Sequence, residues 1–123
     1  MLGHITIRVR DIESTRKFYT ELLAPLGYTL DFDQNFDGVQ VIGFAKDGIF
    51  DTWFTTMTPL SGFCHFAYQV DSRAEVDAFH AAGLAAGGKD NGEPGTRPEY
   101  SEKYYGAFIL DPDGNNVEAM CTL

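Results

Sequence analysis

The sequence predicts an α+β protein built from two βαβββ modules, each a curved mixed sheet with its helix on the convex side and a concave face left for a ligand cleft. Three observations lead to this prediction. Polar and apolar residues alternate at 2–9 and again at 63–70, as in half-buried strands. A helical pattern follows each alternating segment, and short strand segments separated by turn residues follow each helix. We therefore expect a single domain, 1–123, with an internal repeat of approximately 1–58 and 61–123.

The first module begins with the strand Leu2–Val9, whose Ile5 and Ile7 share one face. Asp11 is the expected N-cap of the first helix, and Gly27 is its expected stop. Turn residues then separate three short strands, at Tyr28–Asp33, Val39–Ala45 and Phe50–Thr56.

The second module repeats this order, with a strand at Phe63–Val70 and a helix from Ser72 to about Ala86. The polar, turn-rich stretch Lys89–Lys103 is expected to be a functional loop, with a weak strand near Lys89. An Asp-Pro-Asp-Gly turn joins the two closing strands, Tyr104–Leu110 and Asn116–Thr122.

An offset of 61 residues superimposes the two halves of the sequence. The matches fall on strand faces, helix cores and helix stops, which are the positions that a structural repeat preserves. They are His4 with His65, Val9 with Val70, Phe18 with Phe79, Leu23 with Leu84, Ala24 with Ala85, and Gly27 with Gly88. His80 aligns with Tyr19 and is expected to be exposed to solvent.

Composition narrows the classes of partner. The formal net charge is −9, which argues against nucleic acid or an anionic membrane as a partner. No apolar run is long enough to span a bilayer, and the first residues do not read as a signal peptide. Cys64 and Cys121 lie in apolar runs and are expected to be buried thiols, so a cytoplasmic location is expected.

Three side chains predict a metal site. His4 and His65 occupy matching positions on their strands, and Glu118 lies on the predicted concave face of the last strand. Two imidazoles and one carboxylate suit a divalent ion such as Zn, Fe, Ni, Co or Mn, and three protein ligands leave positions for water and substrate. The alternative is structural: hydrogen-bonded histidines and an ion pair between Glu118 and Arg8.

The sequence resembles the vicinal oxygen chelate superfamily, which includes glyoxalase I, bleomycin-resistance proteins, fosfomycin-resistance transferases and extradiol dioxygenases. The resemblance rests on His4-x-x-x-x-Val9-x-Asp11 with Phe18-Tyr19, on His65, and on Asp111-Pro-Asp-Gly-Asn-Asn-Val-Glu118. It implies that His4, His65 and Glu118 are metal ligands. Glyoxalase I has a further Glu on the fourth strand, where this sequence offers Thr52 or Trp53, depending on the alignment.

Two functions follow. The first is a metal-dependent lyase, isomerase or transferase that acts on a small oxygen-rich substrate by stabilising an oxyanion. The alternative is a module that binds or sequesters small molecules without catalysis. Tyr104 and a metal-bound hydroxide are both candidate proton carriers, and a homodimer is expected. Candidate substrate contacts are Arg8, Trp53, Arg97, Tyr100 and Tyr105.

Overall fold

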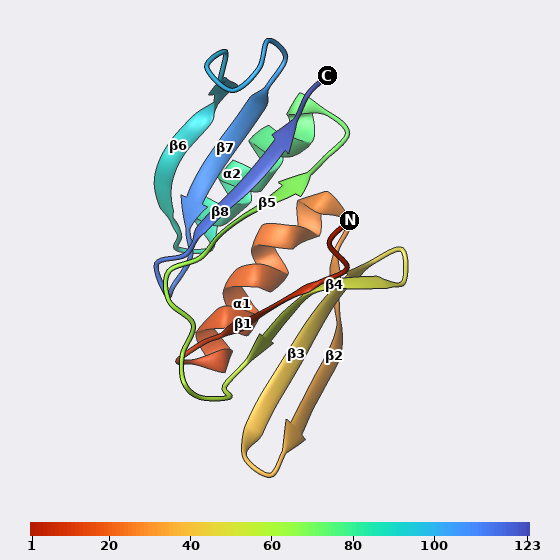
Figure 1. Cartoon of the computed structure of the whole chain (residues 1–123), viewed down its shortest axis with the longest axis vertical. Helices are drawn as coiled ribbons and strands as arrows, with labels where there is room; N and C mark the ends of the chain where they lie inside the picture. Colours follow the sequence, from red (N-terminus) through yellow and green to blue (C-terminus); the bar gives the residue numbers. More distant parts are fainter. The chain divides into compact units, whose positions relative to one another are not determined.

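The computed structural model describes residues 1–123 and has the predicted α+β architecture (Figure 1). The chain forms two compact units, Met1–Gly62 and Phe63–Leu123. Each unit contains one α-helix and a four-stranded mixed sheet, which confirms the predicted fold class. No helix of the structure is long and apolar enough to cross a membrane.

The first unit has the strand order β1-β4-β3-β2. Strand β1 runs parallel to β4, and the other neighbours are antiparallel. The elements are β1 (Ile5–Arg8), α1 (Ile12–Leu23), the short 3₁₀ helix η1 (Ala24–Leu26), β2 (Thr29–Phe36), β3 (Val39–Lys46) and β4 (Ile49–Thr55).

The second unit repeats this topology with the order β5-β8-β7-β6, in which β5 and β8 are the parallel pair. Its elements are β5 (His65–Gln69), α2 (Arg73–Ala85), β6 (Lys89–Thr96), β7 (Tyr105–Leu110) and β8 (Asn116–Cys121).

One predicted loop is partly a strand. Residues 89–96 of the stretch Lys89–Lys103 form β6, which pairs with β7. The pairing register shifts on both sides of Gly92, and β6 is the edge strand of its sheet. An edge strand tolerates glycine, proline and bulges that a central strand does not, so the turn-rich composition gave only the signal of a weak strand near Lys89.

Both helices begin where the sequence predicts. The Asp11 carboxylate accepts a hydrogen bond from the Glu13 N–H at 3.0 Å, and the Ser72 hydroxyl accepts one from the Glu75 N–H at 3.2 Å. These caps satisfy backbone donors that the first turn leaves free. Gly27 has a φ of 87°, a left-handed conformation that suits glycine and ends the first helical segment.

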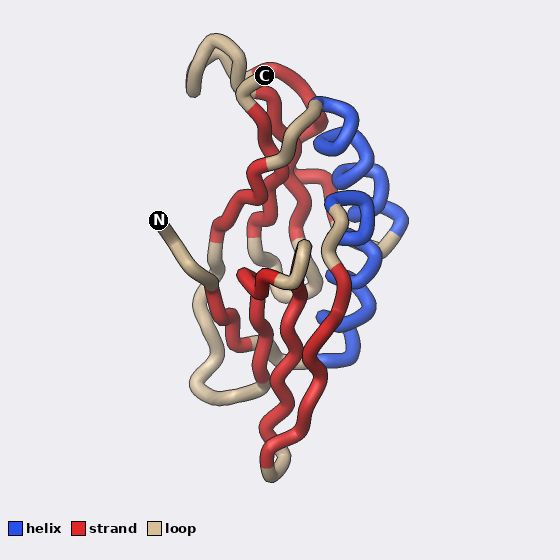
Figure 2. Tube along the Cα trace, turned by 90° about the vertical axis from the view of Figure 1, so that its right-hand side faces the viewer, coloured by secondary structure: helices blue, strands red, loops and turns tan.

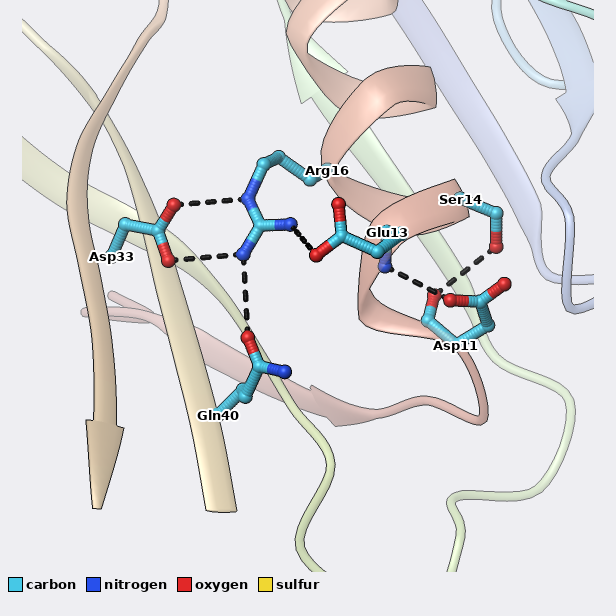
Figure 3. A network of polar contacts seen from close by, with 6 residues as sticks. All are labelled: Asp11, Glu13, Ser14, Arg16, Asp33 and Gln40. Carbon is cyan, nitrogen blue, oxygen red and sulfur yellow. Dashed lines mark hydrogen bonds and ion pairs between the residues drawn. The ribbon is translucent and has the colours of Figure 1, made fainter. Parts of the chain in front are cut away.

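The core of the first unit lies between α1 and one face of its sheet. The backbone trace of Figure 2 shows helical segments running alongside strands. The centroid of the Tyr19 ring of α1 lies 4.3 Å from that of Phe54, and Tyr19 also contacts Phe44. All three rings are fully buried. Arg16 also ties α1 to the sheet: its guanidinium donates two hydrogen bonds to Asp33 on β2, at 2.9 and 3.0 Å, and one to Gln40 (Figure 3).

The core of the second unit lies between α2 and the adjacent sheet face. Val76 and Phe79 of α2, Ile109 of β7 and Val117 of β8 are fully buried. Since successive strand residues point to opposite faces, Asn116 and Glu118 lie on the face away from α2. His80 is 4% exposed, so the expectation that it is exposed was wrong. The residue lies against β6, of which the sequence indicated only a weak strand near Lys89.

Candidate functional site

In the second unit, the sheet face away from α2 brings His65 and Glu118 together. The His65 Nε2 lies 3.2 Å from the Glu118 Oε2, and the His65 Nδ1 lies 3.0 Å from the Asn116 carbonyl oxygen. The parallel ladder between β5 and β8 produces this juxtaposition by pairing Ala67 with Glu118. Glu118 is 3% exposed, whereas half of the His65 side chain is exposed. A buried carboxylate therefore lies beneath an accessible imidazole.

Tyr104 holds the second oxygen of this carboxylate, because its hydroxyl donates a hydrogen bond to the Glu118 Oε1. Burial raises the pKa of Tyr104, and its hydrogen bond to Glu118 and the carboxylate charge raise it further. Tyr104 therefore keeps its proton at neutral pH and acts as a donor. Its ring meets that of Tyr100 edge to face at 5.1 Å.

A cavity of about 250 Å³ opens beside this pair. The Arg97 guanidinium lies 5.5 Å above the Phe108 ring, and the Phe108 ring is 6.1 Å from that of His65, so the cavity adjoins the imidazole. The buried Asn116 Oδ1 has no hydrogen-bond partner. The cavity is lined by Asn91, Gly92, Arg97, Tyr100, Phe108 and Asn116.

Asn116 and Phe108 also belong to this site, although neither was predicted from the sequence as a site residue. Asn116 could have been found from the strand alternation that identified Glu118, because the two residues are two positions apart. Phe108 carried no such signal. Its role depends on the antiparallel register that pairs it with Glu118.

The first unit carries a larger groove, of about 500 Å³, on one face of its sheet. His4, Thr6 and Arg8 contribute alternate positions of the β1 segment to this groove. The Arg8 guanidinium also donates to the Pro59 carbonyl at 3.3 Å. The remaining lining is mostly apolar and consists of Val41, Phe50, Trp53, Thr55 and Met57.

Trp53 forms the aromatic wall of this groove. Its ring stacks on Phe50 at a centroid distance of 5.0 Å and meets Phe32 edge to face at 5.3 Å. The indole lies flat over Gly43, where an added Cβ would lie 2.5 Å from the Trp53 Cζ3. Glycine at 43 thus provides the space that the indole occupies.

Strand register decides which residue matches Glu118 in the repeat. Thr6 pairs with Trp53, as Ala67 pairs with Glu118, and Thr6 and Ala67 are 61 residues apart. Trp53 therefore holds the position equivalent to Glu118. Thr52 is 1% exposed and lies on the opposite face of β4.

The structure does not bring Tyr105 to the open face with His65 and Glu118. Its hydroxyl donates to the Asp77 carboxylate at 2.7 Å, and the Arg73 guanidinium lies 4.8 Å above its ring. Both partners belong to α2, so Tyr105 packs on the helix side. Of the predicted residues in the second unit, His65, Glu118, Tyr104, Arg97 and Tyr100 lie at or beside the cavity.

Comparison with known proteins agrees with this architecture. A family model described as the Glyoxalase/Bleomycin resistance protein/Dioxygenase superfamily matches residues 1–119. No curated protein matches the chain.

Solved structures extend the match over nearly the whole chain. A glyoxalase/bleomycin resistance protein from Albidiferax ferrireducens is 30% identical, with a TM-score of 0.72 and 97% of each chain covered. Glyoxalase I from Zea mays is 25% identical, with a TM-score of 0.74; the match covers 97% of this chain but 43% of the maize chain. A glyoxylase/bleomycin resistance protein/dioxygenase domain from a Frankia species shares the fold at 17% identity and a TM-score of 0.79, with 100% of this chain and 98% of that one covered.

The repeated βαβββ topology, the match of the family model and these relatives lead to one conclusion: the chain belongs to the glyoxalase/bleomycin resistance protein/dioxygenase superfamily.

Proposed function

We propose that the protein is a divalent-metal-dependent enzyme whose ligands are His4, His65 and Glu118. It acts on a small oxygen-rich molecule in a lyase, isomerase or transferase reaction. The observation that carries the proposal is the approach of the His65 Nε2 to the buried Glu118 carboxylate, at 3.2 Å.

The hydrogen bond of the His65 Nδ1 indicates which ring nitrogen of His65 carries a proton. The Asn116 carbonyl can only accept, so the His65 Nδ1 must donate to it. In a neutral imidazole, the Nε2 then presents a lone pair toward the carboxylate, which is also an acceptor. Either a second proton on the imidazole or a metal cation between the two acceptors relieves this conflict. The donor set therefore fits a metal ion.

The charge around Glu118 supports the same assignment. Burying a carboxylate is costly unless a charge or hydrogen bonds compensate it. Within the second unit, no lysine or arginine pairs with Glu118; its partners are the imidazole of His65 and the hydroxyl of Tyr104. A bound cation supplies the compensating charge.

When bound at these ligands, a divalent ion would supply Lewis-acid stabilisation of negative charge on a substrate oxygen. The residues of the chain do the rest. Tyr104 orients the Glu118 carboxylate through its hydrogen bond, as groups beyond the ligands commonly do. Arg97 offers a positive charge to an anionic substrate group, and the buried Asn116 Oδ1 can accept from a substrate hydroxyl.

The assignment of His4 rests on the repeat, which gives it the strand position of His65, and on its place in the groove of the first unit. In this proposal Trp53 provides an apolar wall for the substrate, and Arg8 provides a second positive charge. A homodimer is also part of the proposal.

A specific observation favours a second function, the binding of a small molecule without catalysis. Trp53 replaces a carboxylate at the position equivalent to Glu118, and the Phe50, Trp53 and Phe32 rings form a continuous aromatic surface. Such a surface suits a planar apolar ligand.

The metal content of protein purified without a chelator tests the first function. We expect the Glu118→Gln variant to lose one ion per chain relative to wild type. A matched control is Glu102→Gln, because Glu102 is an exposed carboxylate of the 97–104 loop. Unchanged metal content in Glu118→Gln, or no metal in either protein under added Zn²⁺, would contradict the proposal and favour the binding function.

A further inference from the structure

We propose a second divalent-cation site on the helix side of the second unit, formed by His80, Asp90 and Glu93. His80 lies in the second half of α2, and the two carboxylates lie on the edge strand β6. One candidate ligand atom from each residue lies within 4.8 Å of the other two.

The three side chains differ in solvent exposure, as expected for a site that is open to solvent on one side. His80 is 4% exposed, so packing of α2 fixes its imidazole, whereas Asp90 and Glu93 are exposed. The His80 Nε2 lies 2.9 Å from the Asp90 Oδ1. An ion here would be held by one packed imidazole and two solvent-exposed carboxylates.

The distances agree with the coordination of a small transition ion. Ligands about 2.0–2.1 Å from a tetrahedral ion are about 3.3 Å apart. The His80–Asp90 separation, 2.9 Å, is close to this value, and a carboxylate oxygen of Glu93 lies within 4.8 Å of the ligand atoms of both residues. One imidazole and two carboxylates suit Zn²⁺, Co²⁺ or Ni²⁺, and the remaining positions are open to water.

The local charge also favours a cation. The hydrogen bond from His80 lowers the pKa of Asp90, and a hydrogen bond from the Gly92 N–H lowers it further. Asp90 is therefore ionised at neutral pH, and Glu93 adds a second negative charge. The imidazole of His80 can bind a metal ion through a ring nitrogen in place of a proton.

This site is separate from the His65–Glu118 pair. Asp90 pairs with Ile109, which is buried on the α2 side of β7, whereas the neighbouring Phe108 lies on the opposite face with Glu118. The two sites thus lie on opposite faces of one sheet. A bound ion would fasten β6 to α2, and the Asn91–Gly92 segment of β6 also lines the cavity beside His65.

A simpler role exists for part of this cluster, because the His80–Asp90 hydrogen bond alone can link α2 to β6. That link does not need Glu93. The Glu93→Gln variant therefore separates the two interpretations, since it changes an exposed side chain and leaves the link intact.

The experiment titrates Zn²⁺ into metal-stripped protein in competition with a chromophoric chelator. The background is Glu118→Gln, which removes the proposed catalytic site. We expect this background to bind one Zn²⁺ per chain, and we expect Glu93→Gln or Asp90→Asn added to it to weaken that binding at least tenfold. Glu102→Gln in the same background is the control and should bind as the background does.

Addition of Zn²⁺ should also shift the ring nitrogen resonances of His80 in the background variant, and thermal melting should show that the exposed-carboxylate variants remain folded. No Zn²⁺ binding in Glu118→Gln, or equal binding with and without Glu93→Gln, would overturn the second site. Neither outcome bears on the first site, which the comparison of wild type with Glu118→Gln tests separately.

Discussion

Trp53 occupies in the first unit the ladder position that Glu118 occupies in the second, because Thr6 and Ala67 are their respective partners on the parallel edge strands. The repeat thus has a carboxylate in one half and an indole in the other. The groove of the first unit therefore has an aromatic wall at the position where the second unit has a buried carboxylate.

Under the proposed function, a carboxylate at position 53 should strengthen metal binding. We expect Trp53→Glu to raise Zn²⁺ affinity about tenfold, because it adds an anionic ligand. The loss of the Phe50 and Phe32 contacts should lower the free energy of unfolding by about 1–3 kcal/mol. Trp53→Gln loses the same packing without adding charge and is the matched control; equal Zn²⁺ affinity in both variants in a calorimetric titration would contradict the expectation.

Removal of the Tyr104 hydroxyl should weaken metal binding without unfolding the protein. Tyr104→Phe keeps the ring and deletes the hydrogen bond to Glu118, so the carboxylate loses its orientation. We expect Zn²⁺ affinity to fall about 10-fold or more, as is typical for a group that orients a ligand. Tyr100→Phe is the control, because its ring contacts Tyr104 at 5.1 Å. The same fall in both variants would point to general disturbance of the loop.

A methyl group at position 43 should displace the indole. In Gly43→Ala the added Cβ would lie 2.5 Å from Trp53, so the ring must move. We expect the free energy of unfolding to fall by about 1–3 kcal/mol. The chain has a single tryptophan, so its fluorescence reports both the native environment and the unfolding transition in denaturant. Gly3→Ala is the control, since nothing lies within 4 Å of a Cβ there.

Tyr28 should contribute to the free energy of unfolding at neutral pH, and this contribution should decrease at alkaline pH. Burial raises the pKa of Tyr28, and the hydrogen bond to Asp51, at 2.6 Å, raises it further. The folded state thus favours the protonated phenol. Its contribution is fully present below the unfolded pKa of about 10 and is lost as the pH rises above it toward the folded value. We expect the difference in melting temperature between wild type and Tyr28→Phe to narrow above about pH 10; a constant difference up to pH 11 would contradict this.

The protein should form a homodimer. Large apolar side chains such as Leu2, Phe36, Ile49 and Phe63 are more than half exposed, and a second copy could cover them. Light scattering coupled to size exclusion should give about twice the chain mass of 13.6 kDa. A 13.6 kDa species at micromolar concentration would rule out a stable dimer.

Local patterns in the sequence determined much of the fold. The alternation in β1 and β5, the caps Asp11 and Ser72, and the turn at 111–114 each depend on residues close together in the chain, so they could be predicted directly. The repeat offset likewise brought out His65, and strand alternation placed Glu118 on the face away from α2; these are the two residues that the structure brings within 3.2 Å.

Contacts between distant segments decided the rest. Strand β6 exists because β7 offers hydrogen bonds to an edge rich in glycine, and the burial of His80 follows from the packing of α2 against that strand. The choice between Thr52 and Trp53 likewise depended on the pairing of β4 with β1, which lies far from it in the chain. A shift of one residue in strand pairing turns every side chain to the other face, and local sequence does not set that register. The sequence therefore determined which residues are available to the site, and tertiary pairing decided which of them face it.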